Sequence, residues 1–370
     1  MAAGTRLLDL IPLLEADFRV QVALTIPHAG EEWHGLDTFA RETGMLIVPW
    51  HQATRLDWDL VLTASHRHID QLHGKVLVLP HGASAMRSRC YSRKAGGATR
   101  PTSGLDRELL TYRGRVIPSA LALTHDHELR TLRKTCPEAL PAAVVTGDIC
   151  LDRMLASLPF RDHYRAALGL AEHQRLITIS STWSTDSTFG QHTDIYERLL
   201  DELVDAGHST RVAAVLHPQV WSAHAPWQVR SWLRNALGKG MLLVPPDEGW
   251  RAAMIASDLV IGDHGSTTSY AAAIGRPIAL ATFPHQVIRQ HSLAATLARH
   301  APLLDHDRPL LPQLAAATTC DTPLANSMSA RLGAAARLFR SAMYRLLGLP
   351  EPPWPPPTSP VPLPHTHSWR

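Results

Sequence analysis

Several histidines stand directly after short apolar runs that are typical of buried β-strands. The residues that follow this pattern are His28, His81, His125, His217 and His264. Parallel strands direct their carboxyl ends to the same edge of a sheet, and ligands of open α/β proteins bind at that edge. An imidazole, with an ordinary pKa of about 6.5, can accept or donate a proton near neutral pH. We therefore predict a histidine-lined ligand site, with His81, followed by the small Gly82, as the catalytic base. The alternative is that His81 only packs behind Pro80.

A second pattern is a buried strand that leads through a small polar turn into a helix. After the apolar run 259–261 come Gly262, Asp263, His264, Gly265, Ser266 and Thr267. A helix that begins at Ser266 or Thr267 would direct unpaired backbone N–H groups and hydroxyl donors at an anion, and Gly265 would let that anion approach the backbone. We predict a phosphate site at this turn, with Thr182 of another hydroxyl-rich turn facing the same ligand. An N-cap without a ligand is the alternative interpretation.

The chain around these residues alternates between apolar, β-branched runs and amphipathic stretches. This alternation is typical of βα units that build a parallel sheet. Strands are predicted at 20–26, 45–48, 60–63, 76–79, 121–124 and 143–145, and in the second half at 176–179, 212–216, 241–244, 259–261 and 278–281. Helices are predicted at 151–158, 196–206, 250–256, 268–274 and 330–346.

The resulting fold class is α/β, with two Rossmann-like α/β/α domains whose parallel sheets face a central cleft. We place the first domain at 1–148 and the second at 149–329. A C-terminal helix at 330–349 is expected to pack back on the interface. Residues 350–370 are rich in proline and predict an extended tail with no core of its own.

Composition and charge exclude several classes of protein. The chain has 370 residues, of which 45% are hydrophobic and 19% charged, so it is too apolar to stay disordered. A formal net charge of +3 is small for a dedicated nucleic-acid binder. The four cysteines form no Cys-x-x-Cys pair, which argues against a structural zinc site or a disulfide framework. The sequence shows neither a long apolar stretch nor a leader pattern, and this predicts a cytoplasmic protein.

Two further features leave more than one interpretation open. The basic run from Arg87 to Arg100 could contact an anionic substrate or, peripherally, a membrane surface, or it could be a solvated loop. His-x-His pairs at 66/68, 125/127 and 365/367 could chelate a metal ion. No carboxylate or cysteine spacing completes such a site, so no metal is predicted.

The motifs of residues 75–290 resemble those of the CDP-glycerol glycerophosphotransferase family. The matching segments are Gly147-Asp148, Leu151-Asp152-Arg153, Thr182-Trp183, His217-Pro218, the strand 257–263 that leads to Ser266, and His81-Gly82. The chain is similar to divergent actinobacterial members of that family. The resemblance implies the GT-B glycosyltransferase fold, with His81 as the catalytic base. It also implies that His217, Ser266 and Thr267 hold the pyrophosphate of the donor.

The function implied is a transferase. It would move a glycerophosphate or glycosyl group from a nucleotide-activated donor, CDP-glycerol or a nucleotide sugar, to an acceptor hydroxyl. The acceptor would bind in 1–148 and the donor in 149–329, and neither a cofactor nor a metal would be required. Two alternatives stay open: an isomerase of the non-hydrolysing nucleotide-sugar 2-epimerase kind, and a non-catalytic nucleotide-binding relative.

Overall fold

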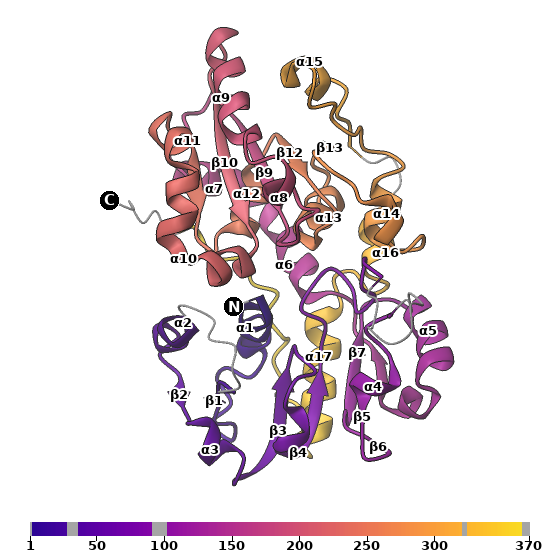
Figure 1. Ribbon diagram of the computed structural model, residues 1–370. Coiled ribbons are helices and arrows are strands. Elements are labelled where there is room, and N and C mark those ends of the chain that lie inside the picture. The colour runs from indigo at the N-terminus through magenta and orange to yellow at the C-terminus, as the bar shows by residue number, and fades with distance from the viewer. Residues whose placement is uncertain (1, 28–35, 91–101, 320–323, 365–370) are drawn as a thin grey trace. The chain divides into compact units, whose positions relative to one another are not determined.

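The structure is a computed structural model that describes residues 2–27, 36–90, 102–319 and 324–364. The chain forms two compact units (Figure 1). The first unit comprises Met1–Asp152 and Asn326–Thr358, and the second comprises Arg153–Ala325 and Ser359–Arg370. Each unit therefore combines a long continuous segment with a short C-terminal one.

The first unit contains a four-stranded parallel sheet. Its strand order is β3-β4-β7-β8, formed by Asp57–Thr63, His73–Val78, Ala120–Leu123 and Ala143–Val145. In register, Val61 pairs with Val76, and Leu121 pairs with Ala143. A separate parallel pair joins β1 (Ala23–Leu24) to β2 (Leu46–Ile47). A short antiparallel hairpin of β5 (Thr111–Tyr112) and β6 (Arg115–Val116) was not predicted.

Both faces of this sheet are buried, because alternate residues of its strands enter two different hydrophobic clusters. Leu77 and Leu79 pack in one cluster with α17 (Ala335–Leu347), which lies along β3 (Figure 1). Val76 and Val78 pack in the other with α5 (His127–Thr135). The remaining helices of the unit are α1 (Ala2–Leu8), α2 (Leu36–Glu42), α3 (Trp50–Ala53) and α4 (Arg107–Leu110). Helix α6 (Ile149–Ser157) runs across the division between the units.

The second unit contains a five-stranded parallel sheet. Its order is β11-β10-β9-β12-β13, formed by Leu242–Val244, Thr210–Leu216, Arg175–Ser181, Leu259–Gly262 and Ile278–Leu280. The chain moves outward from β9 to β11 and then returns to place β12 on the other side of β9. The strand order thus reverses between β9 and β12, and ligands of open α/β sheets bind at the carboxyl ends of the strands at such a point.

Helices cover this second sheet on both faces. Ile177 and Ile179 pack under α9 (Ile195–Asp205), α10 (Pro218–Trp232) and α11 (Arg234–Gly238). Thr178 points the opposite way, and its hydroxyl bonds the hydroxyl of Ser257 at the end of α12 (Trp250–Ala256), 2.6 Å away. The other helices are α7 (Arg161–Ala167), α8 (Thr188–Gln191), α13 (Ser266–Ala273), α14 (Leu293–Leu297) and α15 (Leu310–Leu314). Helix α16 (Leu324–Met328) runs across the division between Ala325 and Asn326.

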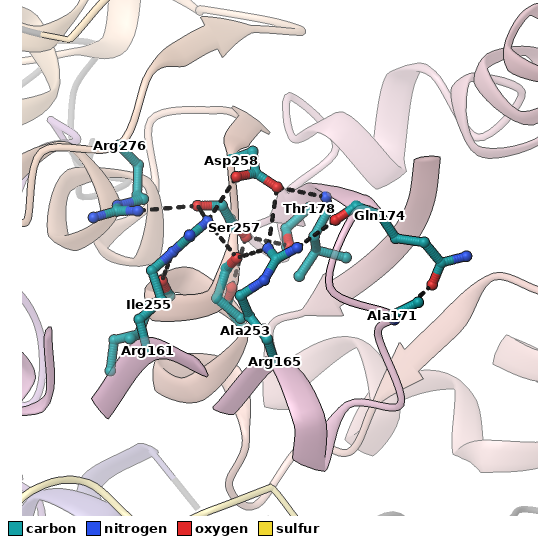
Figure 2. Close-up of polar contacts among 12 residues, drawn as sticks. Arg161, Arg165, Ala171, Gln174, Thr178, Ala253, Ile255, Ser257, Asp258 and Arg276 are labelled. Atoms are coloured by element: carbon teal, nitrogen blue, oxygen red, sulfur yellow. Dashed lines mark hydrogen bonds and ion pairs between the residues drawn. The ribbon is translucent and has the colours of Figure 1, made fainter. Parts of the chain in front are cut away.

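A cluster of arginines fastens α7 to the loop between α12 and β12 (Figure 2). Asp258 accepts hydrogen bonds from Arg161 at 2.6 Å and from Arg165 at 3.2 Å. Arg276 donates to the Ser257 carbonyl at 3.2 Å. Partial burial alone would raise the pKa of Asp258, but the Leu176 N–H and the Arg161 guanidinium bind the carboxylate and hold its pKa below the usual range. These contacts lie at the amino end of β12. The turn that follows β12 lies at the opposite, carboxyl edge of the sheet.

The proline-rich C-terminal segment has no helix or strand over residues 350–364, but it is not detached. Val361 is buried, its N–H donates to Ser157 Oγ at 2.9 Å, and its carbonyl accepts from the Tyr164 hydroxyl at 2.6 Å. The Arg153 guanidinium also donates to the Ser359 carbonyl at 2.9 Å. Residues 359–361 thereby pack on the second unit.

Candidate functional site

Three neighbouring strands of the second sheet end next to predicted ligand residues. Thr182 follows β9, His217 follows β10 and Asp263 follows β12, and β9 lies between the other two strands. The His217 N–H donates to the Ser181 carbonyl at 2.9 Å, so β9 and β10 stay paired up to this edge. The predicted residues that are far apart in sequence are thus brought together at one edge of the second sheet.

Asp263 is the centre of this edge. It is buried, and its Oδ2 accepts hydrogen bonds from the N–H groups of Thr182 at 2.9 Å and Thr188 at 3.1 Å. Its Oδ1 accepts from the Gly265 N–H at 2.9 Å. The carboxylate therefore fixes the loop after β9 and the turn after β12 in one arrangement, and it offers no donor to a phosphate.

The turn after β12 depends on its glycines. A Cβ on Gly262 would lie 2.3 Å from Thr268 Oγ1, so only glycine lets Thr268 fold back and accept the Asp263 N–H at 3.3 Å. A Cβ on Gly265 would lie 3.0 Å from Asp263 Oδ1 and 3.3 Å from Thr182 Cβ. These close approaches explain why the loop requires small residues immediately before the helix.

Helix α13 begins at Ser266, as predicted. Ser266 is exposed and Thr267 is half-buried, and within the described part of the chain neither hydroxyl has a hydrogen-bond partner. The first N–H groups of an α-helix have no acceptor inside the helix and carry partial positive charge. This eight-residue helix therefore presents hydroxyl and N–H donors beside the point where the strand order reverses.

The two histidines of this edge differ in their surroundings. His217 caps α10, and its Nδ1 accepts the Gln219 N–H at 3.0 Å. A neutral ring that accepts at Nδ1 carries its hydrogen on Nε2. His264 lies inside the turn and is 5% exposed.

In the first unit, His81 follows β4 at the carboxyl edge of the sheet. Its Nδ1 lies 3.0 Å from the Ala64 carbonyl. A carbonyl can only accept, so Nδ1 carries the hydrogen and Nε2 keeps the lone pair that a general base needs. Although the residue is exposed at the surface, protein atoms surround the imidazole on other sides, and this desolvation lowers its pKa, assisted by the charges of Arg6 and Arg87. The ring is consequently neutral at neutral pH.

Other histidines stand near the same edge. His66 follows β3, and desolvation together with the charges of Arg87 and His81 lowers its pKa to about 4. The rings of His125 and His127 lie 4.4 Å apart, and desolvation followed by the charge of His125 lowers the pKa of His127 to about 4. His28 lies outside the described residues, as do residues 91–100 of the basic run.

A buried glutamate that sequence reasoning missed fixes the loop after His81. Glu128 is completely buried in α5. Its Oε1 accepts from the Ser84 hydroxyl and from the Met86 N–H at 3.2 Å, and its Oε2 accepts from the Thr124 N–H at 2.8 Å. Desolvation raises the pKa of this carboxyl. Sequence reasoning predicted no helix at α5, and an acidic residue in the first turn of that helix does not by itself reveal a partner about forty residues away.

Arg6 reinforces that loop from another side. Its guanidinium donates to the Gly82 carbonyl at 3.4 Å and to Asp148 Oδ1 at 3.3 Å. The family-like motif residue Asp152 accepts from the N–H groups of Gly333 at 2.8 Å and Ala335 at 3.0 Å, just before α17. In this chain, Asp148 and Asp152 therefore have structural contacts within the first unit.

The described residues contain neither a metal-binding cluster of side chains nor a membrane-spanning helix. No group of three or more histidine, cysteine, aspartate or glutamate side chains in this part of the chain is arranged to hold a metal ion. No helix there combines the length and the apolar character needed to cross a membrane.

No protein-family model matches the chain, and no curated protein matches it in sequence. Its fold is similar to that of a variant of the wall teichoic acid polymerase TagF, with a TM-score of 0.57 at 10% identity over 93% of this chain and 85% of that one. A form of TagF soaked with CDPG gives a TM-score of 0.53 at 10% identity, over 91% and 83% of the two chains. The UDP-GlcNAc 2-epimerase from Neisseria meningitidis, bound to UDP-GlcNAc, gives 0.52 at 14% identity, over 92% and 96%.

At these identities the likeness shows the fold. The chain has the two-domain, Rossmann-like α/β fold of GT-B glycosyltransferases and epimerases, as predicted. The turn between β12 and α13 lies at the carboxyl edge of the second sheet. His81, which follows β4, lies at the carboxyl edge of the first sheet.

Proposed function

We propose that this protein is a transferase that moves a glycerophosphate or glycosyl group from a nucleotide-activated donor to an acceptor hydroxyl. The observation that carries the proposal is the start of α13, where Ser266 and Thr267 present unpartnered hydroxyls beside the reversal of strand order. The similar structures add support, since one was soaked with CDPG and another binds UDP-GlcNAc.

In this proposal the second unit holds the diphosphate of the donor. Ser266, Thr267 and the first N–H groups of α13 donate to the phosphate oxygens, and Gly265 keeps the approach open. His217 contacts the phosphates from the neighbouring strand end, and Thr182 and His264 border the same turn. Asp263 acts as a positioning residue, because its carboxylate already accepts three backbone N–H groups. These donors stabilise the negative charge that develops on the departing nucleotide without a metal.

The first unit supplies the base. His81 Nε2 takes the proton of the acceptor hydroxyl while the oxygen forms its new bond to phosphorus or to the anomeric carbon. The bond between that atom and the nucleotide breaks, and its electron pair leaves with the nucleotide phosphate. Gly82 and His125 are the further acceptor-side residues of the proposal, together with His28. The acceptor itself and the peripheral contact of the basic run from Arg87 to Arg100 with a membrane surface remain predictions.

A nucleotide-sugar epimerase is the second candidate, because one similar structure is a 2-epimerase that is matched over nearly its whole length. Both reactions use the same diphosphate site, so the geometry of α13 supports either. They differ in their products: an epimerase returns the nucleotide sugar with one inverted carbon, whereas a transferase releases free nucleotide.

The first experiment is a thermal-shift panel with CDP, UDP, GDP, dTDP and their glycerol or sugar adducts. A ligand at about 100 times its Kd stabilises the folded state by about 2.7 kcal/mol. The adduct of the best nucleotide is then incubated with the enzyme and an acceptor. Release of CMP indicates glycerophosphate transfer, release of a nucleoside diphosphate indicates glycosyl transfer, and an epimerised adduct indicates isomerisation. Binding without turnover would support the non-catalytic alternative, and no binding by any nucleotide would end the proposal.

A further inference from the structure

A shallow hollow of about 410 Å³ lies in the second unit, beside the turn that carries Thr182. One wall is the segment from Trp183 through α8, and the other is α10. The residues that matter for its chemistry are Trp183, Ser184, Thr185, Phe189, His224 and Trp232. Its volume falls in the range of small-molecule sites.

Two tryptophans on this hollow leave much of their surface open. Trp183 is 52% exposed and Trp232 is 47% exposed. The Trp232 ring is nevertheless held in place, with its centroid 5.9 Å from that of Phe189 and 4.9 Å from that of His224. Large aromatic rings that are rigidly supported and yet exposed are typical of binding surfaces.

The polar groups of the hollow are hydroxyls, indole N–H groups and one imidazole, and only some of them form hydrogen bonds within the described part of the protein. Ser187 Oγ accepts the Gly190 N–H at 3.1 Å, and the Thr193 hydroxyl donates to the Phe189 carbonyl at 2.8 Å. Ser184 Oγ is buried and has no hydrogen-bond partner among the described residues. The lining contains no Asp, Glu, Lys or Arg side chain. A ligand with a formal charge would find no counter-charge here, because burying a charge without a partner is costly.

Gly190 allows the backbone of the first wall, the segment from Trp183 through α8, to fold closely on itself. A Cβ at this position would lie 2.6 Å from the Ser184 carbonyl oxygen and 2.8 Å from that of Thr185. The backbone of 184–190 is thus folded tightly on itself, which holds Ser184 and Trp183 where the hollow begins.

We propose that this hollow is a binding site for a neutral sugar ring, separate from the phosphate site at α13. The apolar face of a sugar packs on tryptophan, and its hydroxyls both donate and accept, as does the exposed hydroxyl of Thr185. A nucleobase would also stack, but its fixed donors and acceptors find only rotating hydroxyls and one imidazole here. The hollow begins at Trp183, next to Thr182, but its lining includes neither Thr182 nor any residue of the turn after β12, so the sugar site shares no residue with the phosphate site.

The test is saturation-transfer NMR on the full chain with N-acetylglucosamine and methyl glucoside as probes, and with cytidine and uridine as comparison ligands. We expect saturation of the sugar ring protons in the parent protein. Trp232→Ala or Trp183→Ala should weaken sugar binding by about tenfold or more. Trp227→Ala is the matched control, since Trp227 stands on the same helix and is 76% exposed but does not line the hollow.

Circular dichroism confirms that each variant is folded, and Trp183→Ala remains informative if Trp232→Ala disturbs the packing around Phe189. The proposal is overturned if neither sugar is saturated, if only the nucleosides are, or if Trp227→Ala lowers sugar binding as much as the other two changes. The double change Ser266→Ala with Thr267→Ala should leave sugar binding unchanged. Failure of the nucleotide site and failure of the sugar site are therefore separate results.

Discussion

The carboxyl edges of the two sheets share one structural feature, a buried carboxylate that accepts backbone N–H groups, but they present different side chains. In each, a buried carboxylate accepts N–H groups from two loops: Glu128 in the first unit and Asp263 in the second. The loops fixed by Glu128 contain His81 and His125, whose ring nitrogens can accept and donate protons. The turn fixed by Asp263 ends in hydroxyls and the start of a helix, which bind anions. The scaffold is shared, and what differs is the chemistry of the groups beside it: imidazoles in the first unit, and hydroxyls with helix N–H groups in the second.

The largest expected effect comes from removing the base of the first edge. His81→Ala should lower turnover by about 10²- to 10⁴-fold while nucleotide affinity stays the same, because general base catalysis contributes in that range. Steady-state kinetics and nucleotide titration measure the two quantities, with the exposed His51→Ala as control. A His81→Ala enzyme that turns over at the parent rate would remove His81 from the mechanism. A loss of stability with normal turnover per folded molecule would show that the residue only packs behind Pro80.

Next in size is the loss of a carboxylate that holds loops. Glu128→Ala leaves the Ser84 hydroxyl and the N–H groups of Met86 and Thr124 without their acceptor, and we expect the free energy of unfolding to fall by about 2–4 kcal/mol. Glu128→Gln, which keeps a carbonyl acceptor, should lose less. Urea denaturation measures both, and faster hydrogen exchange at the Met86 and Thr124 amides localises the effect. If Glu128→Ala is no less stable than the exposed control Glu42→Ala, the loops do not depend on this carboxylate.

A smaller effect is expected at the second edge. Ser266→Ala combined with Thr267→Ala should weaken binding of the best nucleotide by about 1–3 kcal/mol, the usual cost of losing hydrogen bonds to a charged group. Stability should hardly change, because these hydroxyls have no partner in the described part of the chain. Calorimetric titration measures the affinity, with the exposed Ser209→Ala as control. Equal affinity in a folded double variant places the nucleotide elsewhere.

The smallest expected effect is a pH dependence of stability that belongs to the first edge. The pKa of His66 is about 4 in the folded protein, below its ordinary value of 6.5. Between these values the unfolded chain binds the proton more readily, so stability is lost as pH falls from about 6.5 to about 4, by about 1–2 kcal/mol. His66→Gln should flatten the curve of unfolding free energy against pH in this window, and the exposed His73→Gln should not. An unchanged slope in His66→Gln would contradict the lowered pKa.

Local patterns in the sequence determined the strands of both main sheets and the start of α13. Each predicted β-branched run coincides with an observed strand, and Ser266 is the first residue of its helix, since strand periodicity and Ser/Thr preference near helix starts depend on neighbouring residues. The β5–β6 hairpin was not predicted because residues 111–116 contain no run of apolar residues. Helix α17 begins five residues after the start of the predicted range, because Gly333, with φ of 71°, interrupts the helical backbone before it.

Only the tertiary structure decided how these elements cooperate. The order β11-β10-β9-β12-β13 places Thr182 beside Asp263, 81 residues away, and no local pattern encodes that contact. The sequence singled out Asp263 as a phosphate-site residue, whereas the structure shows its carboxylate occupied by three backbone N–H groups. The contacts of Glu128 and the hollow of Trp183 and Trp232 could not be predicted either, because they too join residues that are far apart in sequence. A side chain's burial and partners depend on chain segments that meet only when the sheet forms, while a strand or a helix start is specified by the residues that compose it.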